Sequence, residues 1–361
     1  MSSSIGKLFR LTTFGESHGI AMGGVIDGCP SGFEIDFDHI QQFLDKRRPG
    51  SSSIYSQRNE FDKVEFMSGF LDGVTLGSSI GFFIKNSDQK SKDYSNYQDV
   101  FRPSHSDYTY ESKYGIRDNR GGGRSSARET ANWVVAGAIA TQILSLKNIN
   151  IYSYVSAVGD VVLNQKNNKL DLNNIYNNNV RCPSAKTASL MESLISACKK
   201  SGDTIGGQVS TIIQGLPVGL GEPVFDKLNA SLAKAIIGIN ACRGIEFGSG
   251  FAGSSRKGSE ENDQFFVDSN SIKVKTNNSG GIQGGISNGQ DVFFKSAFKP
   301  VSTIMKKQST VNNKLQQVNL MPAGRHDPCV VPRVVPIVSA LTAIIVLDHY
   351  LLSKTIKLSD L

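Results

Sequence analysis

The segment Gly121-Gly122-Gly123-Arg124-Ser125-Ser126-Ala127-Arg128-Glu129 is the most informative part of this sequence. Its three glycines let backbone amides approach a ligand closely, and the apolar run from Trp133 to Leu144 predicts a mostly buried helix directly afterwards. Ser126 and Glu129 have the spacing of a capping box. Exposed amides, a helix N-terminus and two arginines predict a site for phosphate or another anion. The alternative is an ordinary glycine loop before a well-capped helix.

Apolar periodicity elsewhere in the 361-residue chain predicts both helices and strands. Helical spacing is clearest at 37–45, 129–146, 188–200, 226–239 and 337–352. Strand-like runs cover 79–85, 149–158, 207–214 and 291–298. Because the strands come singly and in pairs rather than in alternation with helices, we expect an α+β fold with antiparallel sheets and not a doubly wound fold. No repeat or charged linker divides the chain, so we expect a single domain over residues 1–361.

The run at 337–352 is the longest apolar stretch, and it predicts a core helix opened by Pro336 at its first turn. It carries several polar residues and is shorter than the roughly 20 residues needed to cross a bilayer. The first residues lack the pattern of a signal peptide. The five cysteines are odd in number and far apart, which predicts reduced thiols rather than disulfides or metal ligands. We therefore expect a cytoplasmic protein.

The net charge of +7 suits either nucleic acid or a small anionic ligand. The arginines lie beside glycine, serine and histidine rather than in a basic stripe, at Arg47, Arg48, Arg102, Arg120, Arg124, Arg128, Arg243 and Arg325. Such clusters are typical of bidentate phosphate or carboxylate binding. Basic residues do not alternate with aromatic ones, as single-stranded nucleic acid would require.

Three of the five histidines lie in short polar motifs, and this placement favours proton transfer. The motifs are Gly15-Glu16-Ser17-His18-Gly19, Arg102-Pro103-Ser104-His105 and Gly324-Arg325-His326-Asp327-Pro328. His39 and His349 lie in helical patterns and are predicted to be structural. The sequence contains no Walker A motif, zinc-binding helix, hydrolase serine elbow or Rossmann fingerprint.

Three polar segments, 51–56, 254–262 and 306–319, have few large apolar residues to anchor them. We expect them to be mobile. An active-site lid and a plain surface loop would both have this composition.

Taken together, the motifs resemble those of the chorismate synthase family. The resemblance is carried by Thr12 to Gly19, Arg102 to Asp107, Arg120 to Thr130, Ile239 to Ala241, Gly280 to Ser287, Lys299 to Thr303 and Gly324 to Cys329. These segments span nearly the whole chain. The family resemblance implies a helical layer sandwiched between antiparallel β-sheets, in a homotetramer. It also implies elimination of phosphate from 5-enolpyruvylshikimate 3-phosphate to give chorismate, with reduced FMN required but not consumed.

The same resemblance implies roles for individual residues. His18 would protonate the departing phosphate, His105 would protonate the reduced flavin, and Asp327 would act with the flavin to remove the C6 proton. FMN would be held by Arg124, Ser125, Ser126, Asn240, Ala241, Gly284, Lys299, Pro300, Val301, Ser302, Thr303 and Arg325. The substrate would be held by Arg47, Arg48 and Arg128.

The sequence departs from the family pattern at one place. A further family arginine is missing around Ser53, and Arg58 is the nearest substitute. We also expect no flavin reductase in this chain, because it has no dinucleotide fingerprint and no appended segment. Reduced FMN would then come from an external flavin reductase or the cellular flavin pool.

Two other functions would share some of these sequence features. An FMN-dependent oxidoreductase acting on a small anionic substrate would share the flavin site but consume reducing equivalents in proportion to product. A nucleic-acid-binding protein would show binding that weakens steeply with salt, and the scattered arginines disfavour it. We therefore expect a small-molecule substrate and neither nucleic acid nor a membrane as partner.

Overall fold

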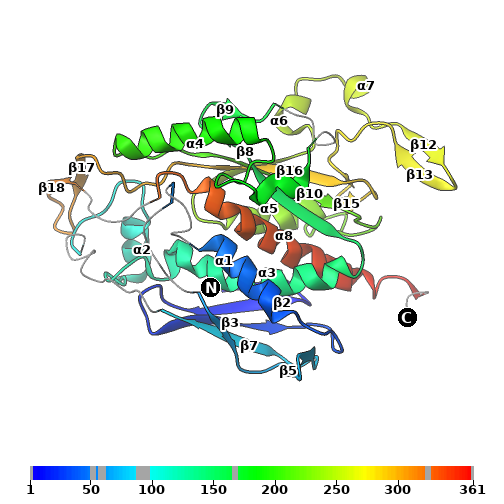
Figure 1. Cartoon of the computed structure of the whole chain (residues 1–361), viewed down its shortest axis with the longest axis horizontal. Helices are drawn as coiled ribbons and strands as arrows, with labels where there is room; N and C mark the ends of the chain where they lie inside the picture. The colour runs from blue at the N-terminus through cyan, green and yellow to red at the C-terminus, as the bar shows by residue number, and fades with distance from the viewer. Residues whose placement is uncertain are drawn as a thin grey trace.

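The computed structural model describes residues 3–48, 54–55, 62–86, 98–164, 170–321 and 327–358. A layer of helices lies between two five-stranded sheets, and a further helix covers the outer face of one sheet (Figure 1). The strand pairs within both sheets are antiparallel. The expected α+β fold, with a helical layer between antiparallel sheets, is confirmed.

The first sheet is built from the N-terminal part of the chain in the order β1-β2-β3-β7-β4. Its strands are β1 (Ser4–Ile5), β2 (Arg10–Gly15), β3 (Ala21–Asp27), β4 (Val64–Phe66) and β7 (Ile80–Lys85); β5 (Phe70–Leu71) and β6 (Val74–Thr75) form a separate hairpin. In β7, Ile80, Phe82 and Ile84 share the buried face. Periodicity predicts β7 but not β2 and β3, because glycines and threonines interrupt the apolar alternation there.

The second sheet has the order β11-β16-β10-β8-β9. Its strands are β8 (Asn150–Val158), β9 (Val161–Val162), β10 (Gly207–Gln214), β11 (Cys242–Phe247) and β16 (Val292–Phe298). Observed and predicted bounds agree within one residue for β8, β10 and β16. Helix α8 packs on one face of β8 and α4 (Ala185–Lys200) packs on the other, so the last six residues of β8 are all buried.

The helical layer contains α1 (Phe37–Arg47), α3 (Thr130–Ser145), α5 (Leu228–Ile237) and α8 (Val331–Ser353). Apolar side chains of this layer and of both sheets form one contiguous core cluster. Helices α3 and α8 approach closely at Gly137, where a Cβ would lie 2.3 Å from both Cα and Cβ of Ala340. Only glycine at position 137 permits this approach of the two backbones.

Helix α8 corrects the predicted start of the C-terminal helix. It begins at Val331, so Pro336 lies inside the helix and not in its first turn. The ring of Pro336 leaves the carbonyl of Pro332 without its helical donor, and Arg181 Nη1 donates to that carbonyl at 2.6 Å. With 23 residues and a mean hydropathy of 1.9, α8 is long enough to cross a membrane, but 89% of its most apolar stretch is buried inside the protein.

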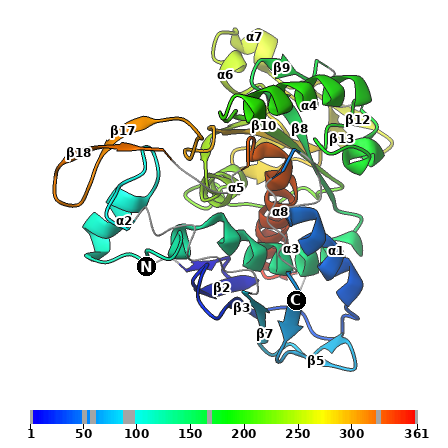
Figure 2. The ribbon, with the colours of Figure 1, turned by 60° about the vertical axis from the view of Figure 1, so that its left-hand side comes forward.

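The remaining elements lie mostly at the edges of the layers. They are α2 (Asp107–Tyr114), α6 (Gly250–Gly253), α7 (Gly258–Glu261), β12 (Phe265–Asp268), β13 (Ser271–Val274), β14 (Ile282–Gln283), β15 (Ile286–Ser287), β17 (Gln308–Val311) and β18 (Gln317–Leu320). Figure 2 shows α2 beside the β17–β18 hairpin at one end of the molecule. Two of the segments predicted to be mobile therefore contain regular elements: 254–262 contains α7, and 306–319 contains most of the hairpin. Most of 51–56 lies outside the described residues.

The close approach of α3 and α8 predicts a specific loss of stability in Gly137→Ala. The new methyl group would overlap the backbone of Ala340 and push the helices apart, so we expect the free energy of unfolding to fall by about 1–3 kcal/mol. Urea unfolding would measure the change. Gly258→Ala is the matched control, because a Cβ at Gly258 in α7 meets open space. An equal effect of both substitutions would contradict close packing as the cause.

Candidate active site

A cavity of about 590 Å³ lies where the N-terminal ends of α3 and α8 meet three loops. Its walls are formed by Arg47, Arg102, Ser104, His105, Ser106, Thr109, Gly122, Ser125, Ser126, Ala127, Arg128, Asn240, Ala241, Arg243, Lys299, Pro300, Val301, Ser302, Thr303, Asp327, Val330 and Arg333. Segments from six distant parts of the sequence thus come together. Most residues that the sequence analysis assigned to a ligand site are among them.

The wall of the cavity is strongly cationic. Six of its side chains are arginine or lysine, and Asp327 is the one carboxylate among the lining residues. The positive ends of two helices, α3 and α8, add to this charge. The predicted anion site is therefore supported by geometry, since two helix ends and several guanidinium groups lie around one space.

Asp62, a fully buried carboxylate, holds two of these arginines in place. Its Oδ2 accepts from Arg47 Nη1 at 2.7 Å, and its Oδ1 accepts from Arg128 Nη1 at 2.7 Å. Arg47 Nε also donates to Thr130 at 3.0 Å, and Arg128 Nε donates to Asn86 at 2.6 Å. Burial acts to raise the pKa of Asp62, but the two guanidinium groups hold it below the usual value. Sequence reasoning missed Asp62, because no local motif marks it.

The glycine-rich segment differs from the predicted capping box. Two 3₁₀ turns, Gly123–Ser125 and Ala127–Glu129, precede α3. Ser126 caps the second turn by accepting from the backbone amide of Arg128, not from that of Glu129. The Glu129 carboxylate instead accepts from Arg124 at 2.6 Å, Asn132 and Trp133. Burial raises the pKa of Glu129, against the hydrogen bonds that it receives.

Because the Glu129 carboxylate binds Arg124 instead of completing a capping box, the two arginines of the segment have different surroundings. Arg124 donates to Glu129 and to Thr13 Oγ1 of β2 at 2.8 Å, and it does not line the cavity. Arg128 does line the cavity. Of the two arginines predicted to flank one anion, only Arg128 therefore lies in the cavity wall.

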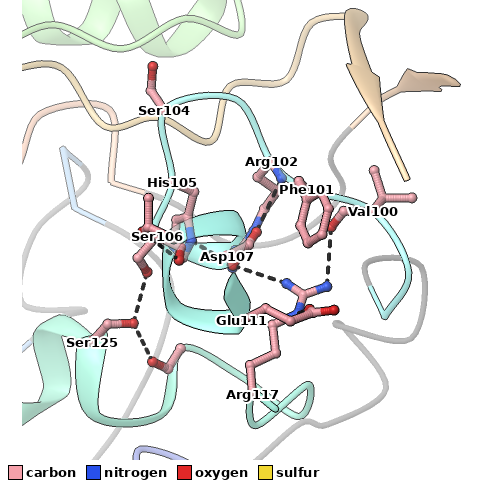
Figure 3. Close-up of polar contacts among 12 residues, drawn as sticks. Val100, Phe101, Arg102, Ser104, His105, Ser106, Asp107, Glu111, Arg117 and Ser125 are labelled. Atoms are coloured by element: carbon pink, nitrogen blue, oxygen red, sulfur yellow. Dashed lines mark hydrogen bonds and ion pairs between the residues drawn. The ribbon is translucent and has the colours of Figure 1, made fainter. Parts of the chain in front are cut away.

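The loop around His105 faces the cavity beside the predicted flavin residues (Figure 3). Ser106 Oγ lies 2.9 Å from Ser125 Oγ, and Asn240 Nδ2 donates to the Ser125 carbonyl at 2.8 Å. Lys299 Nζ donates to the Ser104 carbonyl at 2.9 Å. Burial, with the nearby charge of Arg243, lowers the pKa of Lys299. These bonds join four loops into one wall.

Asp327 forms an ion pair with Arg333, a residue that the sequence analysis did not assign to the site. Its Oδ2 accepts from Arg333 Nη1 of α8, and Arg333 Nε also donates to the carbonyl of Arg47 at 3.3 Å. Arg102 and Arg243 line the cavity outside the predicted set, and Asp107 accepts a hydrogen bond from Arg102. Arg102 and Arg243 belong to the arginine clusters that the sequence analysis identified. Arg333 lies outside these clusters, several residues after the last motif.

Some predicted ligand residues lie outside the cavity wall. His18 is buried, contacts Ser17 Oγ through Nδ1 at 3.0 Å, and packs so tightly on Gly121 that a Cβ there would lie 2.1 Å from its ring. Arg48 lies 3.9 Å from Asp45 at the end of α1. Gly284 occupies the turn between β14 and β15. Arg325, Ser53 and Arg58 lie outside the described residues.

The sequence and the fold are similar to those of known proteins. The family model of chorismate synthase matches residues 9–351. Chorismate synthase of Christiangramia forsetii is 56% identical over 356 residues, which cover 99% of each chain. Chorismate synthase of Flavobacterium psychrophilum is 54% identical over 352 residues, 98% of each chain. A crystal structure of a chorismate synthase has a TM-score of 0.78 and 26% identity, covering 97% of this chain and 94% of the other.

The shared carboxylate predicts a distinctive pH dependence in Asp62→Asn. Two buried arginines would face a neutral amide, so we expect the free energy of unfolding at pH 7 to fall by about 3–5 kcal/mol. Because the folded-state pKa of Asp62 is lowered, the wild-type carboxyl stabilises the fold above about pH 4 and loses this effect as the pH falls through the folded-state value. The variant should therefore lose less stability on acidification, as measured by urea unfolding between pH 7 and pH 3.

Asp226→Asn provides the control for this measurement. Asp226 pairs with Lys7 on the surface, where both side chains are about half exposed and water screens the pair. This variant should stay close to the wild type at pH 7. A similar small change in Asp62→Asn would show that the buried arginines do not depend on Asp62.

Proposed function

The chain belongs to the chorismate synthase family, and on this premise we propose that it eliminates phosphate from 5-enolpyruvylshikimate 3-phosphate to form chorismate, with reduced FMN as a cofactor that is not consumed. It is a carbon–oxygen lyase of aromatic amino acid biosynthesis. The observation that carries the proposal is the cationic cavity, which joins His105, Asp327 and six arginine or lysine side chains. Phosphate and carboxylate groups on one small molecule suit this combination.

The cavity suits FMN in size and in donor chemistry. Its volume of about 590 Å³ lies within the range of small-molecule pockets, roughly 300–1,000 Å³. Ser125, Ser126, Asn240, Ala241 and the residues Lys299, Pro300, Val301, Ser302 and Thr303 line it and would hold the flavin. Ala241 has a left-handed backbone, with φ of 68°, and its carbonyl accepts from the Lys299 amide at 2.9 Å. When bound, the reduced flavin supplies electron density to the substrate and regains it, so that no net oxidation occurs.

The substrate would be held by charges that are already fixed in position. Asp62 accepts a hydrogen bond from Nη1 of Arg47 and another from Nη1 of Arg128. Because both guanidinium groups are already fixed, the binding of an anion does not have to order them. Arg333 is likewise held against Asp327. Arg48 and the flavin contacts Arg124, Gly284 and Arg325 remain predictions from the family resemblance.

Three side chains are proposed to move protons. His105 lines the cavity and would deliver a proton to the reduced flavin. The Asp327 carboxylate would accept the C6 proton with the flavin, and Arg333 orients it. His18 would protonate the departing phosphate, and its neighbour Gly121 directly precedes the cavity-lining Gly122. A cytoplasmic location and dependence on an external source of reduced FMN complete the proposal.

We also propose that the protein assembles with copies of itself, as a homotetramer. The β12–β13 hairpin supports this, because Phe265, Val267 and Ile272 are 63%, 77% and 71% exposed on a small two-stranded element. Exposed apolar side chains of this kind are typical of protein interfaces. Sedimentation equilibrium tests the proposal, and a monomeric mass at micromolar concentration would contradict it.

The redox balance distinguishes the lyase from an oxidoreductase. Under anaerobic conditions with chemically reduced FMN, we expect many turnovers of phosphate release and chorismate formation for each flavin. Loss of one reduced flavin for each product would instead identify an oxidoreductase. NADPH with oxidised FMN should support no sustained turnover by the pure protein, because the sequence has no dinucleotide-binding fingerprint. Steady NADPH oxidation coupled to chorismate formation would contradict that expectation.

The two histidines are tested by replacement with alanine. Loss of a positioned general acid lowers turnover by roughly 10²–10⁴-fold, so His18→Ala and His105→Ala should each fall in this range. Binding of FMN and substrate should change by less than about tenfold, or 1.4 kcal/mol. His39→Gln in α1 is the control and should keep its activity, because His39 lies outside the cavity wall. Near-normal turnover in either alanine variant would show a structural role for that histidine.

A further inference from the structure

The carboxylate of Asp107 contacts His105 (Figure 3), and Asp107 is not among the residues that line the cavity. Asp107 is the first residue of α2 and is 5% exposed. Its Oδ1 lies 2.8 Å from His105 Nδ1 and 2.8 Å from Arg102 Nη2. Its Oδ2 accepts from Arg102 Nε at 2.7 Å. A second arginine, Arg117, approaches Oδ1 to 3.3 Å through Nη1.

These distances determine which ring nitrogen of His105 carries hydrogen in the neutral form. Nδ1 lies 2.8 Å from an oxygen of Asp107 and 3.1 Å from Arg102 Nη2. An ionised carboxylate only accepts and a guanidinium only donates. Without a hydrogen, Nδ1 would place a lone pair against the carboxylate oxygen at the shorter of the two distances. Nδ1 therefore carries the hydrogen and donates it to Asp107.

The other ring nitrogen, Nε2, is available to exchange a proton with a ligand. His105 lines the cavity, and Nε2 has no hydrogen-bond partner among the residues that the structure describes. In the neutral ring Nε2 is an acceptor, and in the charged ring it carries the proton that a ligand in the cavity can take. The Asp107 bond also restrains the rotation of the ring.

We propose that Asp107 is the positioning residue of His105: it holds hydrogen on Nδ1 and so makes Nε2 the nitrogen that exchanges a proton with the ligand. The inference rests on the proposed function, in which His105 is the proton donor. In the donating step the N–H bond at Nε2 breaks, the ligand gains the proton, and the ring becomes neutral with Nδ1–H retained. Asp107 stays ionised throughout.

The charges around His105 make Asp107 necessary. Arg102 Nη2 lies 3.1 Å from His105 Nδ1, Arg117 approaches Asp107, and the cations Lys299 and Arg243 line the same cavity as His105. Asp107 is the carboxylate that contacts both His105 and Arg102, so its negative charge opposes that of the nearby cations. Burial acts to raise the pKa of Asp107, yet hydrogen bonds from Arg102 and His105 hold it well below the usual value, so it remains an anion.

The first test is made on the flavin-free wild-type protein and needs no activity. Long-range ¹H–¹⁵N spectra report which nitrogen of each neutral histidine carries hydrogen, and His105→Asn assigns the His105 signals among the five histidines. We expect the Nδ1–H form for His105. Finding hydrogen on Nε2 of the neutral ring would overturn the proposal. Because this readout is independent of turnover, failure of the wild type to form chorismate would count against the proposed function alone.

The second test compares Asp107→Asn with Glu111→Gln. Glu111 lies on the same helix and pairs with the same arginine, at 2.8 Å from Arg117 Nε, but it makes no contact with His105. In Asp107→Asn, a neutral amide replaces the ionised acceptor that faces Nδ1 of His105. The Nδ1–H preference should weaken. Turnover should fall at least about tenfold, up to the roughly 10²–10⁴-fold worth of the general acid itself.

Glu111→Gln should keep the tautomer of His105 and most of the turnover. An unchanged tautomer of His105 in Asp107→Asn would overturn the proposal, whatever the turnover. Equal changes in both variants would likewise overturn it, since they would point to the shared Arg117. If Asp107→Asn fails to fold, the spectrum of the wild type still decides the question.

Discussion

The contact between Gly137 of α3 and Ala340 of α8 is the constraint on which the rest of the structure depends. Both helices are buried between the sheets, so neither can shift without opening the core. Both also begin at the cavity, where α3 follows the glycine-rich turns and α8 follows Asp327. The close packing of two long helices therefore sets the distance between loops that lie about two hundred residues apart in sequence.

A second constraint is that the arginines of the cavity wall are held by acidic side chains. Asp62 forms ion pairs with Arg47 and Arg128, Asp107 with Arg102, and Asp327 with Arg333. These pairs limit the motion of the guanidinium groups, at a cost in desolvation that buried ion pairs always carry. The wall remains cationic because Lys299, Arg243 and two helix N-termini add to it. A polyanionic ligand would thus meet donors that are already in place.

The histidines show how tertiary surroundings separate side chains with similar local sequences. His18 and His105 both lie in short polar motifs, but His18 is packed beneath Gly121 while His105 faces the cavity. His39 and His349, predicted to be structural, lie in α1 and α8, and burial lowers the pKa of each. The sequence motifs identify the histidines near the site, and the fold determines which of them lines the cavity.

The sequence by itself determined the parts of this protein that depend on short-range patterns. Periodicity located α1, α3, α4 and α5 and the strands β7, β8, β10 and β16 to within a few residues, since burial imposes a repeat of two or 3.6. It found α8 as well, but placed its start after Pro336 instead of at Val331. Glycine, serine and arginine motifs located the loops that line the cavity. Only the tertiary structure paired Asp62 with Arg47 and Arg128, Asp327 with Arg333, and Arg181 with the carbonyl freed by Pro336. Such partners are chosen by which buried groups meet across the folded chain, and a buried charge or carbonyl needs a partner wherever in the sequence that partner lies.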